Sequence, residues 1–197
     1  MKRSLSALLL GVAMLLASAQ VHAAILRFEA LLDGPSWEPD ATVITPGTGS
    51  AVVLIDTLLK LMTVHIEFAN LLGNTTASHI HCCTTLPLTG LAGVATTTPT
   101  FAGFPLGVTS GVYDATLDLT LASSYNPSFV TSSGGIAAAE ARLIANMLDE
   151  KTYVVVHSQF RPAGEIRGFL QQVPEPGTLA LLALGLAGLA ATRRRNQ

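Results

Sequence analysis

Cysteine, positive charge and catalytic motifs are all scarce in this 197-residue chain. Only two cysteines occur, so the fold does not depend on a network of disulfide bonds. Of 11 basic side chains, five lie within the first three and last five residues. Residues 24–173 therefore hold six basic and twelve acidic side chains, a net charge near −6. This balance excludes nucleic acid as a partner, because phosphate binding needs a basic face.

The absence of catalytic motifs is as informative as the charge. The chain has no G-x-S-x-G motif, no defensible Ser-His-Asp order and no carboxylate pair placed for acid–base work. We therefore expect no catalytic residues and a protein that is not an enzyme.

The two cysteines, Cys82 and Cys83, are neighbours in the sequence. Neighbouring Cα atoms lie about 3.8 Å apart across a trans peptide, which is less than the usual span of a disulfide. A bond between them would join no distant parts of the chain. Free thiols, a pair facing a metal and a disulfide between neighbours all remain open.

The first 23 residues have the three parts of a secretory signal peptide. Lys2 and Arg3 supply the charge, residues 5–19 form an apolar run, and Val21-His22-Ala23 suits a cleavage site. We expect cleavage before Ala24, with an uncleaved membrane anchor as the alternative.

The last 24 residues (174–197) also have three parts: a short motif, an apolar run at about 178–192 and a basic end. A helix over the apolar run spans roughly 24 Å, slightly less than a bilayer core of about 30 Å. We expect a transmembrane helix with its arginines on the cytoplasmic side. The residues of the motif and the basic end are Pro174, Glu175, Pro176, Arg193, Arg194 and Arg195.

This tail resembles the bacterial PEP-CTERM sorting signal. The resemblance implies that an exosortase-type enzyme recognises the tail and removes the helix near Pro174-Glu175-Pro176. The protein would be exported, briefly anchored in the inner membrane, and then displayed at the cell surface or secreted. A permanent C-terminal anchor is the alternative.

Residues 24–173 have the size of one domain, and most of them have the alternating pattern of strands. The clearest strand is 61–69, in which apolar and polar residues alternate. One amphipathic helix is predicted at Ile136–Leu148, and 84–111 and 123–135 are predicted loops. Further strands are expected at 24–32, 48–56, 77–82, 112–121 and 165–170, and another begins at residue 153. At most a short strand is expected at 91–95. The pattern predicts a mostly antiparallel β-sandwich or barrel.

Two histidines lie on one side of the strand at 77–82. His79 and His81 are two residues apart, so their imidazoles share a face and can reach one metal ion. His157 is the candidate third ligand, with His65 or a cysteine as further candidates. The alternative is structural: the histidines bond to carbonyls of the long loop that follows.

The strand with His79-Ile80-His81, a long loop, and then Tyr153 and His157 resembles the CHRD domain, named from chordin. The match continues through Pro162, Gly164, Glu165, Ile166, Arg167 and Gly168. The resemblance implies an immunoglobulin-like β fold without an established activity in bacterial members. Ser158 and the spacing of Pro162-Ala163-Gly164 depart slightly from the family pattern, and the cysteine pair is not a family feature.

Glu165 and Arg167 lie on the same face of a predicted strand and are expected to pair with each other or with neighbours, in a structural role. The leading functional hypothesis is a non-catalytic surface or extracellular-matrix protein that binds a polysaccharide or a protein. The alternative is a copper- or zinc-binding domain that uses the three histidines. A third hypothesis, capture of a protein ligand, is analogy with chordin alone.

Overall fold

The computed structural model describes residues 25–36 and 43–173. The predicted signal peptide at 1–23 and the sorting tail at 174–197 lie outside these residues. Within the two described ranges, no helix has both the length and the apolar character needed to cross a membrane.

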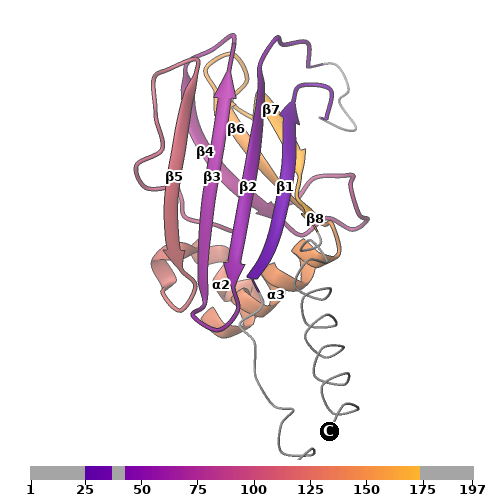
Figure 1. Cartoon of the computed structure of the whole chain (residues 1–197), viewed down its shortest axis with the longest axis vertical. Coiled ribbons are helices and arrows are strands. Elements are labelled where there is room, and N and C mark those ends of the chain that lie inside the picture. The colour runs from indigo at the N-terminus through magenta and orange to yellow at the C-terminus, as the bar shows by residue number, and fades with distance from the viewer. Residues whose placement is uncertain (1–24, 37–42, 174–197) are drawn as a thin grey trace, which may run out of the picture.

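The described strands form a single antiparallel sheet, ordered β4-β6-β7-β1-β2-β3-β5, with β8 also paired to β1. The sheet curls into a half-barrel, so that β4, β6 and β7 lie behind β1, β2, β3 and β5 (Figure 1). The prediction of a mostly antiparallel β domain is confirmed. The strands are β1 (Ile25–Asp33), β2 (Thr48–Asp56), β3 (Leu61–Ala69), β4 (Thr75–Cys82), β5 (Gly111–Asp118), β6 (Thr152–Ser158), β7 (Ile166–Phe169) and β8 (Gln171–Val173).

Two α-helices cover one end of the sheet (Figure 1), not the single helix predicted. The predicted helix is α3 (Ile136–Leu148), whose buried residues include Ala139, Leu143 and Met147. The additional helix is α2 (Pro127–Ser133), in a segment predicted as loop and preceded by the short 3₁₀ helix η1 (Ala122–Ser124). Its signals are local: the Asn126 side chain caps the start, and Gly134 ends the helix with a positive φ.

The structure changes the extent of two predicted strands. The strand expected to reach residue 121 ends at Asp118, where the chain turns toward η1. The strand expected at 165–170 is the four-residue β7, and β8 follows after one residue. The segment 91–95 is not a strand, although Val94 forms an isolated β-bridge with His81.

The β4-β6-β7 layer is covered on both faces. Its inner side chains, such as Ile80 and Val154, belong to the main core that they share with β1, β2 and β3. On the outer face, Tyr153 and Val155 form a smaller buried cluster with Val43, against which Ala92 packs. The long loop after β4 thus covers this outer face, where the histidines also lie.

Candidate metal centre

The three predicted histidines converge because β4 pairs with β6. The register places His79 opposite Val155, His81 opposite Tyr153, and His157 opposite Ala77. Directly opposed residues of an antiparallel pair project from the same face, so all three imidazoles lie on the outer face. One ring nitrogen from each histidine lies within 4.8 Å of the others.

Each ring is oriented by a backbone carbonyl. A carbonyl oxygen only accepts, so the ring nitrogen that faces it carries a hydrogen and donates. Two of the carbonyls belong to the long loop after β4, and the third belongs to the turn between β6 and β7. The bonds run from His79 Nε2 to Pro99 (2.6 Å), from His81 Nδ1 to Ala92 (2.9 Å) and from His157 Nδ1 to Pro162 (2.9 Å).

The other nitrogen of each neutral ring presents a lone pair toward the cluster. His79 Nδ1 and His157 Nε2 lie 3.2 Å apart, and with both rings neutral neither has a hydrogen to donate to the other. His81 Nε2 is buried and has no hydrogen-bond partner. Buried nitrogens without partners are uncommon in folded proteins, and the lone pair of His81 Nε2 is open to a ligand that accepts electron pairs.

Burial keeps the rings in the neutral form that binds metals. Loss of hydration lowers the pKa of His79 and that of His81 to about 4, despite the hydrogen bonds to Pro99 and Ala92. Burial likewise lowers the pKa of His157. At neutral pH the rings are therefore uncharged, and protons do not occupy the three converging nitrogens.

An aromatic wall closes one side of the cluster. The Tyr153 ring stacks on His81 with centroids 5.0 Å apart, and its hydroxyl accepts from the backbone N–H of Ala92 (2.9 Å). The guanidinium of Arg167 lies over the Tyr153 ring, 4.9 Å from the ring centroid. The same guanidinium lies 5.3 Å from the centroid of Phe169. These contacts restrict the His81 ring.

The spacing of two of the three donors fits a transition-metal ion. Metal–nitrogen bonds of about 2.0–2.1 Å in a tetrahedral arrangement place two ligand nitrogens roughly 3.3 Å apart. The separation of 3.2 Å between His79 Nδ1 and His157 Nε2 is close to that value. Imidazole suits zinc and copper, and orientation of ligand rings by carbonyls is typical of metal sites. The structural alternative, bonding to loop carbonyls, accounts for only one nitrogen of each ring.

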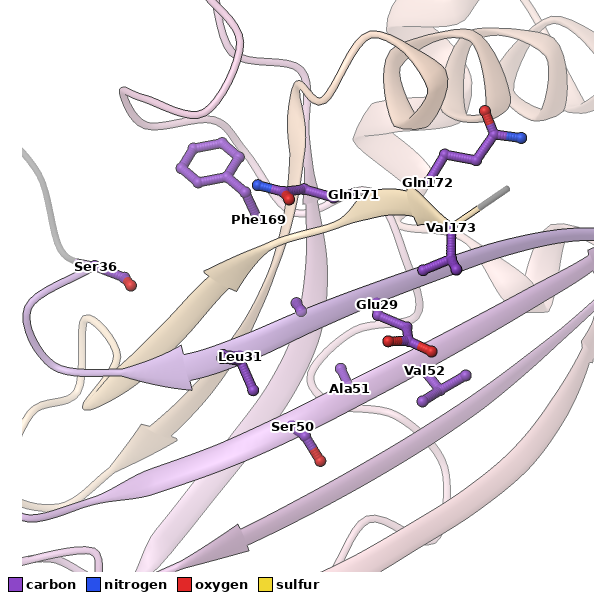
Figure 2. A pocket seen from close by; sticks show the side chains of 11 residues that line it. Glu29, Leu31, Ser36, Ser50, Ala51, Val52, Phe169, Gln171, Gln172 and Val173 are labelled. Carbon is purple, nitrogen blue, oxygen red and sulfur yellow. The ribbon is translucent and has the colours of Figure 1, made fainter. Parts of the chain in front are cut away.

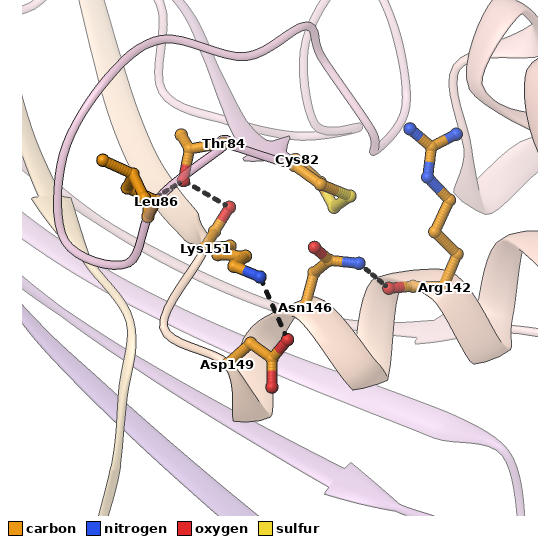
Figure 3. Close-up of polar contacts among 8 residues, drawn as sticks. Cys82, Thr84, Leu86, Arg142, Asn146, Asp149 and Lys151 are labelled. Carbon is orange, nitrogen blue, oxygen red and sulfur yellow. Dashed lines mark hydrogen bonds and ion pairs between the residues drawn. A yellow bond between two sulfur atoms is a disulfide. The ribbon is translucent and has the colours of Figure 1, made fainter.

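The further candidate ligands lie elsewhere. His65 is on β3, where its Nδ1 bonds to Asp114 (2.7 Å). Cys82 and Cys83 form a disulfide with each other, joined by a cis peptide, so neither sulfur is a free thiolate for a metal. Figure 3 shows this disulfide at the end of β4. Of the three possibilities left open for the cysteines, the structure contains the disulfide between neighbours.

The segment after the disulfide is anchored to the chain between α3 and β6 (Figure 3). The Thr84 hydroxyl donates to the carbonyl of Leu86 (2.7 Å), and the Thr84 backbone N–H donates to the carbonyl of Lys151 (3.0 Å). Lys151 in turn forms an ion pair with Asp149 (3.2 Å). These bonds hold the start of the loop whose later residues orient His79 and His81.

Glu165 and Arg167 are fully buried, which their sequence pattern did not show. Arg167 donates to the carbonyls of Ser36 and Gly90. Glu165 accepts from two hydroxyls and two backbone N–H groups. Its donors are Thr45 Oγ1 (2.5 Å), Leu72 N (2.6 Å), Gly73 N (3.2 Å) and Ser158 Oγ (2.5 Å). Both residues bond to neighbouring loops, in line with the expected structural role.

A separate pocket of about 560 Å³ lies where β1 pairs with β8. Figure 2 shows Glu29 and Leu31 of β1 beside it, together with Gln171 and Gln172 of β8. None of the three clustered histidines lines it. Phe169 also lines this pocket and packs 5.2 Å from the Tyr153 ring centroid, so the pocket borders the aromatic wall.

The fold defines a class: an antiparallel β domain whose curled sheet carries clustered histidines on the outer face of one layer. Residues 28–170 match the model of the CHRD domain, and the chain belongs to that family. Residues 172–195 match the PEP-CTERM protein-sorting motif. The six predicted sorting residues fall within that second match. No curated protein and no solved structure matches the chain.

The two family matches confirm both resemblances found in the sequence. The sorting motif marks the chain as an exosortase-processed protein that acts outside the cell.

Proposed function

We propose that the CHRD domain is a non-catalytic binding module that holds one copper or zinc ion through His79, His81 and His157. The observation that carries the proposal is the convergence of three lone-pair nitrogens, one of which, His81 Nε2, is buried without a partner. A structural role alone would not require the second nitrogen of every ring to face the same point.

The sorting signal sets where this module works. Anchored briefly by the apolar run at about 178–192 and then processed near Pro174-Glu175-Pro176, the protein stays at the cell surface or in the extracellular matrix. There the domain meets metal ions that are not buffered by the cytoplasm. Binding of a matrix polysaccharide or protein at the pocket between β1 and β8 is compatible with a bound metal, because none of the three histidines lines that pocket.

The test is the metal content of the full-length chain, purified in mild detergent without chelators or metal-affinity resin. We expect about one copper or zinc ion per chain by elemental analysis. His79→Asn should abolish retention, whereas His65→Asn, which changes a half-buried histidine outside the cluster, should not. His157→Gln serves as a second variant, because His157 is half-buried and its loss is less disruptive.

Two outcomes would contradict the proposal. One is a well-folded wild-type chain that binds neither metal when each is added back in excess. The other is metal retention that survives both His79→Asn and His157→Gln, which would place the ion elsewhere.

A further inference from the structure

The coordination cluster contains no negative charge among the residues that the structure describes. Its three ligands are neutral imidazoles, and the three groups that orient them are neutral backbone carbonyls. In many zinc sites a carboxylate plays that orienting role and makes the imidazole a stronger donor. Here the ligands receive no such support.

A positive group lies close to the cluster instead. The Arg167 guanidinium is fully buried and stacks on Tyr153, which in turn stacks on His81. Only the Tyr153 ring separates this charge from the His81 ring. In the described part of the chain, the polar contacts of the three rings are with one another and with the carbonyls of Pro99, Ala92 and Pro162, with no carboxylate among them.

These surroundings discriminate between ions by charge. The free energy needed to move an ion from water into a poorly polar site rises with the square of its charge, so it is about four times larger for a divalent than for a monovalent ion of equal size. Anionic ligands normally offset this term for Zn²⁺ and Cu²⁺. Neutral ligands beside a guanidinium offset this transfer free energy less than anionic ligands do.

Ligand number points the same way. The described residues supply three nitrogens, and zinc in such a site takes a fourth ligand from water. Cu⁺, by contrast, is stable with three nitrogen ligands and needs no fourth. His79 is buried, which disfavours a bound water on its side of the cluster.

We propose that the tri-histidine cluster selects monovalent copper, Cu⁺, over Zn²⁺ and Cu²⁺. This inference depends on the proposed function, since it specifies which ion the same three residues hold. The domain would then keep bound copper reduced outside the cell.

The experiment compares affinities of the metal-free full-length chain at pH 7. Cu⁺ is titrated anaerobically with ascorbate against a chromophoric Cu⁺ chelator, and Zn²⁺ and Cu²⁺ are titrated against chelators of their own. We expect the Kd for Cu⁺ to be lower than that for Zn²⁺ by a factor on the order of one hundred. The affinity for Cu²⁺ should also be below that for Cu⁺.

A matched pair of variants tests the charge argument. Ala77 is half-buried, lies on the same face as the cluster and is directly opposite His157. Ala77→Glu places a carboxylate beside the site, whereas Ala77→Gln adds a side chain of equal size without charge. The ratio of the Zn²⁺ to the Cu⁺ affinity should rise about tenfold in the Glu variant relative to the Gln variant.

The outcomes separate the two proposals. Zn²⁺ or Cu²⁺ binding as tightly as Cu⁺, with loss of that binding in His79→Asn, overturns the selectivity and leaves the metal site standing. Equal ratios of the Zn²⁺ to the Cu⁺ affinity in Ala77→Glu and Ala77→Gln overturn the electrostatic argument, and with it the selectivity inferred from charge. Absence of binding by all three ions overturns the metal site itself.

Discussion

His79 Nδ1 and His157 Nε2 lie 3.2 Å apart, although 78 residues separate them in the chain. Each ring donates from its other nitrogen to a backbone carbonyl, so two lone pairs face each other across a strand pair. This arrangement follows from the pairing of β4 with β6, which places both rings on one face, and from the carbonyls that orient the rings. Its physical consequence is that a cation placed between the rings stabilises the folded state more than the unfolded state.

Metal binding should therefore raise the thermal stability of the metal-free chain. At a free metal concentration of 100 times the Kd, the gain in unfolding free energy is about 2.7 kcal/mol. The measurement is the Tm of the chelator-treated chain with and without added metal. A shift of the same size in the double variant His79→Asn/His157→Gln would show that the stabilisation arises at another site.

The stability of the metal-free chain should depend on pH through His79 and His81. Burial lowers the pKa of both rings from 6.5 to about 4, so between these values the unfolded chain binds protons that the folded chain does not. Stability is then complete above pH 6.5 and falls as the pH drops toward 4. We expect the urea midpoint of unfolding to fall over the same pH range. In the variant His79→Asn/His81→Asn the urea midpoint should depend less on pH.

His65 supplies a control of opposite sign. The hydrogen bond that His65 donates to Asp114 is the largest influence and raises the pKa of His65 above its usual value of 6.5. The stabilisation that His65 provides is complete below pH 6.5 and is lost as the pH rises through its folded pKa. His65→Asn should therefore leave the loss of stability between pH 6.5 and 4 in place. A chain in which His65→Asn removes that loss would contradict the assignment to His79 and His81.

Glu165→Gln should destabilise the domain by about 2–4 kcal/mol, because a buried carboxylate accepts four hydrogen bonds and an amide can only accept through one oxygen. The measurement is the free energy of unfolding in urea. Glu29→Gln is the matched control: its ion pair with Arg27 is exposed, so the loss should stay below about 1 kcal/mol. Equal losses would show that burial of Glu165 contributes nothing.

The stability of the domain should also depend on pH through Glu165, in a second and more acidic range. Burial by itself would raise its pKa, but the hydrogen bonds from Ser158, Thr45 and two backbone groups outweigh burial and lower the pKa below 4.5. The corresponding stability is complete above pH 4.5 and is lost as the pH falls through the folded pKa. In Glu165→Gln this loss below pH 4.5 should shrink, while the histidine window above it remains.

Gly168→Ala should destabilise the domain by about 3 kcal/mol or more. A Cβ at Gly168 would overlap the carbonyl oxygen of Leu31, where β7 passes β1, so one strand has to move. Gly93→Ala is the control, since nothing lies near a Cβ at that position and its φ is not positive. Thermal unfolding of both variants checks this, and similar Tm values for the two would refute the close approach of β7 to β1.

Local patterns in the sequence predicted much of this fold. The valine- and leucine-rich segment 48–56 and the alternating segment 61–69 predict β2 and β3 with the observed ends. Spacing by two residues also predicts that His79 and His81 share a face. The missed helix α2 is only seven residues long, so its capping residues Asn126 and Gly134 carry more information than its apolar periodicity.

Features that depend on loops were beyond sequence reasoning. Glu165 and Arg167 have the alternation of an exposed strand face, and only the cover of that face by distant segments makes them buried. The carbonyls of Ala92 and Pro99 decide which nitrogen of His81 and of His79 faces the cluster. Their position depends on the path of a long loop, for which composition provides no periodic signal.

Reduction of the Cys82–Cys83 disulfide should change the stability of the domain very little. The bond joins residues one apart in the sequence, so it closes no stretch of chain whose entropy in the unfolded state could be restricted. We expect the Tm to be nearly the same with and without a phosphine reductant. The difference in the free energy of unfolding should be below about 1 kcal/mol. Thiol titration in denaturant should count two new thiols per chain after reduction and none before. A large fall in Tm on reduction would mean that the pair supports the loop that orients His79 and His81, and metal affinity should then fall with it.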